Sequence, residues 1–199
     1  MTKVTKVTSP RACVVMKKMR LKNQAVGPFP GMIVGAMLNE KPTYTTVGAG
    51  GCASLEPVLC VSLKNTHYIT EGIIQNGYFS VNIPSTALLK ELDYCGIVSG
   101  KQVDKSNLFK SFFDAAGDAP MIEECPLNFL CKVCDRKEIR GFTMFFGEIA
   151  AVFASEDCLT GGNPDPIKID PIIMMGFSYC NLEGIIGQPF SEGKKLNRE

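Results

Sequence analysis

The sequence predicts a mainly β protein, a closed or nearly closed antiparallel barrel with a few short peripheral helices. Short apolar and β-branched runs follow one another along the chain, several with strand-like alternation. Two of these runs are joined by about four polar residues, a spacing typical of a hairpin. The helical patterns are few, and they do not alternate regularly with strands as a parallel sheet requires. These observations favour a barrel over a doubly wound sheet.

The N-terminal quarter of the chain contains the first predicted hairpin. Cys13–Met19 is a candidate first strand, and a turn cluster rich in glycine and proline follows at residues 27–31. Met32–Leu38 is apolar throughout and is predicted to be a buried strand. A polar turn then leads to Thr43–Val47, whose threonines and tyrosine favour a second strand.

Two strands and two helices are expected next. Val58–Leu63 is a compact apolar run and is predicted to be a strand. Ile69–Asn76 has a helical pattern that ends at Gly77, a residue typical of a helix C-terminus. Tyr78–Ile83 alternates between apolar and polar residues and predicts a strand with one buried face. Thr86–Cys95 places its leucines on one helical stripe.

The second half of the chain predicts a long hairpin between less regular segments. The phenylalanines of Leu108–Phe113 suggest a short helix. Leu127–Cys134 alternates as a strand, and a charged turn over Asp135–Arg140 would connect it to a long strand at Phe142–Ala154. Ser155–Lys168 is rich in glycine and proline and is expected to be a surface loop.

We expect a single domain over residues 1–199, because the sequence contains neither an internal repeat nor a linker. Residues 1–26 would form an N-terminal extension or first strand, and residues 191–199 a tail. The 45% hydrophobic content supports a core. A net charge of +1 gives no electrostatic basis for binding nucleic acid. No apolar run reaches the roughly 20 residues that span a membrane, so no membrane contact is expected.

The nine cysteines are odd in number, and several lie inside apolar runs, where a free cysteine behaves as a small hydrophobe. Residues 1–12 lack the apolar segment of a signal peptide, so the expected location is the cytoplasm. Cys131 and Cys134 have the spacing of half a zinc site or a redox pair, but no second pair accompanies them. We therefore predict a core residue at Cys131, a strand-end residue at Cys134 and no metal.

Two further motifs have ordinary interpretations. Gly48–Ala53 fits a relaxed dinucleotide-binding fingerprint, but Pro57 and another strand follow where the motif needs a helix. His67 is the only histidine, which makes a hydrolytic triad improbable. We interpret His67 as a turn residue or a surface ligand contact rather than an acid or base. No catalytic residue is nominated.

The best candidate for a ligand site is the stretch from Thr43 to Thr70. Its first part carries hydroxyl groups on a predicted strand, and its glycines allow a backbone to approach a flat ligand closely. Thr66 and Thr70 lie where a helix N-terminus could take a phosphate. Lys105, in a glycine-flanked loop, is by default an ordinary surface residue, although its point charge would also suit a phosphate. These features lead to the hypothesis of a flavin phosphate cofactor.

Taken in order, these residues resemble the flavin reductase-like family and, within it, the flavoredoxin branch. The resemblance covers roughly residues 28–190. The segments that carry it are Lys41–Thr43, Thr46, Ser54–Pro57, Val61–Leu63, Thr70, Phe79–Pro84, Ser99–Gly100, Asp104–Lys105, Gly147–Ile149 and Tyr179–Gly187. It implies an antiparallel Greek-key split β-barrel of the FMN-binding type, and a homodimer with FMN near the subunit interface.

The resemblance also implies which residues hold FMN. Those expected to line the isoalloxazine and ribityl chain are Thr43, Thr45, Thr46, Ala49, Cys52, Ala53 and Ser54. Cys52 would either touch the cofactor or fill space. Thr70 and Lys105 would engage the phosphate, and Phe177 would pack near the ring. Relatives often have asparagine in place of Thr43 and a tryptophan near Ala49, whereas this chain has no tryptophan.

By the same resemblance, the protein would be an FMN oxidoreductase or electron-transfer protein. It would take electrons from NAD(P)H or a protein donor and pass them to a flavin or protein acceptor. The alternative is a flavin-binding module without turnover of its own.

Overall fold

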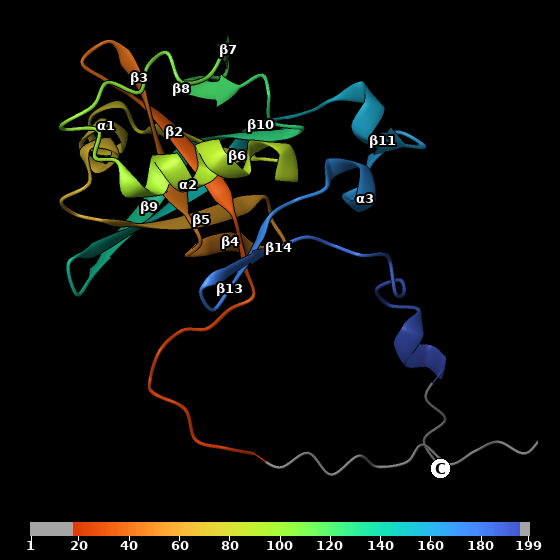
Figure 1. Cartoon of the computed structure of the whole chain (residues 1–199). Helices are drawn as coiled ribbons and strands as arrows, with labels where there is room; N and C mark the ends of the chain where they lie inside the picture. Colours follow the sequence, from red (N-terminus) through yellow and green to blue (C-terminus); the bar gives the residue numbers. More distant parts are fainter. Residues whose placement is uncertain (1–17, 196–199) are drawn as a thin grey trace, which may run out of the picture.

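The computed structural model describes residues 18–195 and is built around one seven-stranded antiparallel sheet (Figure 1). The order of its strands is β3-β2-β6-β9-β10-β5-β4. Their bounds are β2 (Met32–Leu38), β3 (Lys41–Val47), β4 (Gly50–Ser54), β5 (Val58–Lys64), β6 (Tyr78–Ile83), β9 (Leu127–Ile139) and β10 (Phe142–Ala154). The prediction of a mainly β, antiparallel protein is confirmed.

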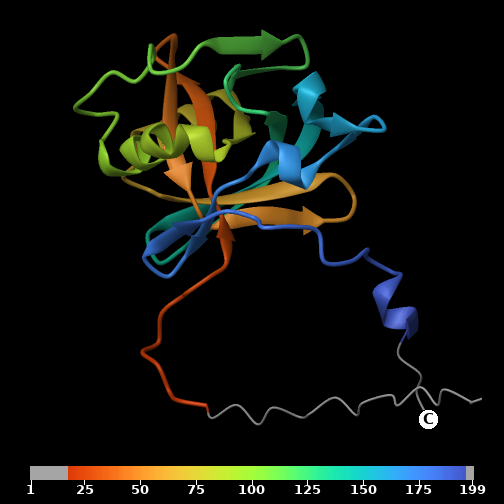
Figure 2. The same ribbon diagram turned by 45° about the vertical axis from the view of Figure 1, so that its right-hand side comes forward.

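Smaller elements surround this sheet. The short strands are β1 (Phe29–Pro30), β7 (Ser111–Asp114), β8 (Gly117–Ile122), β11 (Leu159–Thr160), β12 (Asn163–Pro164), β13 (Ile173–Met175) and β14 (Ser178–Cys180). The helices are α1 (Tyr68–Asn76), α2 (Leu89–Ile97) and α3 (Pro166–Ile169), with 3₁₀ turns η1 (Thr86–Leu88), η2 (Glu156–Cys158) and η3 (Glu192–Lys195). Figure 2 shows the segment after β14 leaving the sheet and running away from it.

The β2–β3 hairpin is covered on both faces. Val34 and alternate residues of β2 join Ile69 and Ile73 of α1 in one apolar cluster. Ile33 instead packs with Leu92 of α2 in a second cluster. Because successive side chains of a strand point to opposite faces, α1 and α2 lie on opposite sides of this hairpin. The edge strand β3 is therefore flanked by one end of each helix.

Strand β6 has the predicted bounds, but the prediction of a single buried face is wrong. Ser80 and Asn82 are both fully buried, because β8 packs over that face of β6, where the Pro120 carbonyl accepts from Ser80. Asn82 donates to the Ile33 carbonyl at 3.0 Å and accepts from the Ile122 backbone N–H at 3.1 Å. Asn128 also donates to the Asn82 side-chain oxygen, at 2.8 Å. These hydrogen bonds satisfy polar groups that burial would otherwise leave costly.

Other predictions need correction. Leu108–Phe113 is not a helix, since its end belongs to strand β7, which pairs with β8. The charged turn predicted at Asp135–Arg140 is mostly strand, because residues 135–139 pair with β10 and the chain turns at Arg140 and Gly141. Cys134 is consequently inside β9 rather than at its end, while Cys131 is a core residue as predicted.

At the edges of the fold, the loop predicted at Ser155–Lys168 contains η2, β11, β12 and the start of α3. The strand predicted at Cys13–Met19 falls almost entirely outside the described residues, and residues 18 and 19 are not in a strand. Among residues 18–195, no helix has the length and apolarity needed to cross a membrane.

Candidate functional site

A cavity of about 220 Å³ opens at the edge of β3, between the start of α1 and the end of α2. Thr43 and Thr45 contribute from β3, and Lys105 comes from the loop that follows α2. The rest of its wall is formed by Tyr44, residues 66–69 and residues 96–100. The fold thus brings together a hydroxyl-bearing strand, a helix N-terminus and a cation from three separate parts of the sequence.

Lys105 is the least expected member of this cavity, because its side chain is only 4% exposed. Its ammonium donates to the Cys95 carbonyl at 3.0 Å, and no carboxylate among residues 18–195 pairs with it. Burial lowers the pKa of Lys105, since desolvation disfavours the charged form. A buried ammonium without a counter-ion is costly, and an anionic ligand in the cavity would offset that cost.

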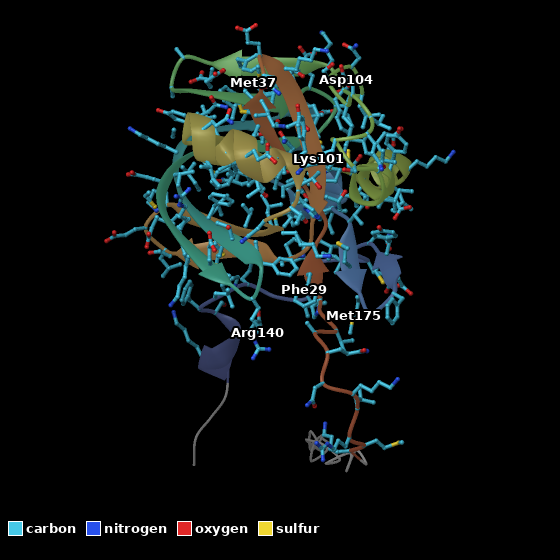
Figure 3. The ribbon with its side chains drawn as sticks, turned by 90° about the vertical axis from the view of Figure 1, so that its left-hand side faces the viewer. Phe29, Met37, Lys101, Asp104, Arg140 and Met175 are labelled. Carbon is cyan, nitrogen blue, oxygen red and sulfur yellow. The ribbon has the colours of Figure 1, made fainter. Side chains whose placement is uncertain are left out.

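Two of the nearby carboxylates are already paired with other lysines. Asp104 accepts from Lys41 at 2.8 Å, and Glu71 lies 3.1 Å from Lys101. Lys41, Asp104 and Lys101 of these pairs line a second hollow of about 190 Å³, which shares Thr43 and Lys105 with the first. In Figure 3, Lys101 and Asp104 lie toward the end of the molecule where Met37 marks the β2–β3 hairpin. Lys105 is the lysine of the cavity wall, and it has no carboxylate partner among residues 18–195.

The start of α1 adds backbone donors to the cavity. The Thr70 N–H bonds to the His67 carbonyl at 3.1 Å, whereas no partner is found for the N–H groups of Tyr68 and Ile69 within residues 18–195. Such free N–H groups and the helix dipole favour an anion. Gly100 keeps the entrance open, because an added Cβ there would lie 2.9 Å from the Tyr68 ring and 3.3 Å from Thr43 Oγ1. The donors and the space suit a phosphate group.

The remaining residues that the sequence proposed do not line this cavity. Thr70 is buried and donates its hydroxyl to the Lys64 carbonyl at 2.9 Å, one turn into α1. Thr46 donates to the Leu92 carbonyl of α2. Ala49 and the β4 residues Cys52, Ala53 and Ser54 are solvent-exposed. Phe177 is fully exposed in the turn between β13 and β14.

The exposed residues share a second region of the molecule. Strand β13 pairs with β1, and a Cβ on Gly48 would meet Met174 of β13 at 3.0 Å. The turn that carries Phe177 therefore lies near the glycine-rich segment before β4. Figure 3 shows Met175 beside Phe29, well away from Met37. Strand β3 joins the two regions, since Thr45 is three residues from Gly48, about 10 Å along an extended strand.

His67, which the sequence indicated as a turn residue or a surface ligand contact, lines the cavity, but its turn position next to a predicted helix gave no indication that part of its ring is buried. Its Nδ1 atom is buried without a hydrogen-bond partner among residues 18–195. Ser99 and Gly100 also line the cavity, and the sequence indicated them only through the family resemblance.

Comparison with known proteins decides the family. The model of the flavin reductase like domain matches residues 27–182. The chain belongs to the flavin reductase-like domain family. The flavoredoxin from Methanosarcina acetivorans is 37% identical and superimposes with a TM-score of 0.85, over 90% of this chain and 98% of that one.

Two further relatives support this assignment. Flavoredoxin of Desulfovibrio vulgaris (Miyazaki F) is 31% identical, with a TM-score of 0.83 over 89% of this chain and 100% of that one. An uncharacterized protein of Archaeoglobus fulgidus is 31% identical over 63% of this chain and 72% of its own length. These matches confirm the predicted resemblance to flavoredoxins and the split-barrel fold. They also support a flavin-related redox function for this member of the family.

Proposed function

We propose that the protein binds FMN and uses it as an oxidoreductase or electron-transfer protein. The observation that carries this proposal is Lys105, a buried ammonium without a carboxylate partner in the described chain, at a cavity lined by hydroxyls and a helix N-terminus. Phosphate is the group that this set of donors recognises best. Membership of the flavin reductase-like family supports a flavin as the molecule that carries this phosphate.

The proposed binding mode places the phosphate in the cavity, where Lys105 and Thr43 would hold it. The ribityl chain would follow β3 toward Gly48, and the ring would lie against the β4 region. The residues that would contact the ring are Ala49, Cys52, Ala53, Ser54 and Phe177. Thr46 would hold β3 through its hydrogen bond to α2, and Thr70 would hold the start of α1 through its hydrogen bond to the Lys64 carbonyl. Bound FMN would supply two-electron or one-electron transfer, while the protein binds and orients it.

The electron donor would be NAD(P)H or a partner protein, and the acceptor a flavin or a second protein. We favour a carrier that retains its FMN, because the most similar structures named above are flavoredoxins. The protein would act in the cytoplasm as one domain spanning residues 1–199.

A second copy of the chain would complete the protein as a homodimer. Ile139, Phe142 and Met144 form an apolar hollow of about 380 Å³ on the outer face of the β5–β10–β9 sheet. Ile186 and Phe190 of the C-terminal segment are also more than nine-tenths exposed. Exposed apolar groups of this size are typical of interfaces. Phe142→Glu should convert a dimer into a monomer in analytical ultracentrifugation, and a wild-type monomer would refute this part of the proposal.

The proposal is tested by the absorption spectrum of the purified protein and the mass of the released cofactor. We expect flavin bands and FMN in a ratio near one per chain, followed by bleaching with NADH, NADPH or neither. Bleaching by one of the nucleotides would indicate a reductase, and resistance to both a carrier. A colourless protein that takes up no added FMN would refute the proposed function.

A further inference from the structure

His67 occupies the N-cap position of α1, where a side chain normally accepts a hydrogen bond from the first turn. Its side chain makes no such bond, although its backbone is in the extended conformation of an N-cap, with φ −69° and ψ 137°. Its Nδ1 atom is buried and has no partner among residues 18–195. Since buried polar atoms are nearly always paired, this nitrogen is expected to meet a group that residues 18–195 do not provide.

Among residues 18–195, no carboxylate acts on His67 electrostatically. His67 lines the same cavity as Lys105 and Thr43, and the charges that act on it are the ammonium groups of Lys105 and Lys64. From α1, Tyr68 also faces the cavity, and Glu71 is paired with Lys101. From the loop after α2, Asp104 is paired with Lys41.

These surroundings keep the free imidazole neutral. Burial lowers the pKa of His67, and Lys64 and Lys105 lower that pKa further. A dianion in the cavity would raise the pKa of His67, because it accepts a hydrogen bond from Nδ1 and adds two negative charges beside the ring.

We infer that His67 donates from Nδ1 to the phosphate of the bound flavin and takes up a proton as the flavin binds. This inference rests on the proposed function for the identity of the ligand. It makes His67 a residue that selects phosphorylated flavin over riboflavin, and it links the affinity for FMN to pH.

The sign of the linkage follows from the proton count. The complex holds one more proton than the free protein, so lowering the pH strengthens binding. The phosphate of FMN stays largely dianionic above its second pKa of about 6. Between about pH 8.5 and 7, FMN should therefore bind at least about threefold more tightly as the pH falls, with a limit of tenfold per unit for one proton. Riboflavin, which lacks the phosphate, should show no such change.

The first test measures the dissociation constants of FMN and riboflavin at both pH values, for the wild type and for His67→Gln. Glutamine retains a hydrogen-bond donor but does not titrate. Lys105 also titrates in the cavity, so the contribution of His67 is the part of the pH dependence that His67→Gln removes. An unchanged pH dependence in His67→Gln, or an equal dependence for riboflavin, would overturn the inference.

The second test uses the wild-type protein alone, with inorganic phosphate and with FMN as ligands. The chain has a single histidine, so tag-free protein gives one histidine C2–H resonance whose pH titration reports on His67. We expect its pKa to rise when inorganic phosphate or FMN is added. FMN binding with an unchanged histidine pKa would overturn this inference and leave the proposed function standing. A rise with inorganic phosphate in a protein that takes up no flavin would place His67 at a phosphate site that is not a flavin site, and would refute both the inference and the proposed function.

Discussion

Replacing Lys105 with methionine should weaken the binding of FMN and leave the binding of riboflavin unchanged. Methionine keeps an unbranched apolar stem but removes the ammonium. A charge-assisted hydrogen bond of a buried group contributes about 1.5–3 kcal/mol. At about 1.4 kcal/mol for each factor of ten, the dissociation constant of FMN should rise about 10- to 150-fold.

The same substitution should have little effect on the stability of the free protein. It removes the cost of burying an unpaired ammonium, and it also leaves the Cys95 carbonyl without its donor at 3.0 Å. These effects oppose each other, so the free energy of unfolding should change by less than about 1 kcal/mol. Lys105 has a lowered pKa in the folded state and about 10.5 when unfolded, so the unfolded state binds more protons in between. The free energy of unfolding of the wild type should therefore rise with pH between the lowered folded-state pKa of Lys105 and about 10.5. The variant should lack this rise.

Isothermal titration calorimetry with FMN and riboflavin, at fixed pH, measures the predicted difference. Lys110→Met is the matched control, because it removes an exposed lysine that pairs with Glu123 at 2.6 Å, and Lys110 does not line the cavity. Its affinity for FMN should match the wild type. An unchanged FMN affinity in Lys105→Met, or an equal loss for riboflavin, would show that the phosphate lies elsewhere.

Three further predictions concern the frame of the site. Tyr44→Phe removes the 2.5 Å hydrogen bond to Ser111 and should lower the free energy of unfolding, measured by urea titration, by about 1 kcal/mol. An unchanged unfolding midpoint would contradict this prediction. Asn82→Ala removes the side-chain partner of two backbone groups, the Ile33 carbonyl and the Ile122 N–H, and should cost about 2–4 kcal/mol. A melting temperature equal to the wild type would contradict this. Gly100→Ala places a methyl 2.9 Å from the Tyr68 ring and should weaken FMN binding about tenfold. Equal FMN affinity in that variant would mean that the entrance is wider than proposed.

The strands of the sheet could be predicted where a periodic pattern coincides with burial. The bounds of β2, β6 and β10 were predicted correctly because their alternation or apolar content is uninterrupted. The second buried face of β6 could not be predicted, since Ser80 and Asn82 look like solvent-facing residues until their partners across the sheet are known. Residues 135–139 are charged, and only their pairing with β10 places them in a strand.

The candidate site likewise contains some residues that the sequence could predict and others that it could not. Thr43 and Thr45 could be predicted because hydroxyls on a strand before a glycine-rich bend are a local signal. Lys105 depended on a family resemblance, because it is about 60 residues away along the chain. The role of His67 depends on the cavity that it shares with β3 and with the loop after α2, segments that the sequence does not place together. No local pattern reports the burial of a single nitrogen atom.

The central claim, that the phosphate of a flavin lies at the edge of β3 beside Lys105, is tested most directly by a crystal structure of the protein with FMN. We predict phosphate density within hydrogen-bond distance of the Lys105 ammonium and of the N–H groups that begin α1. Density for the phosphate at any other place, with the cavity beside Lys105 filled by water alone, would contradict the account.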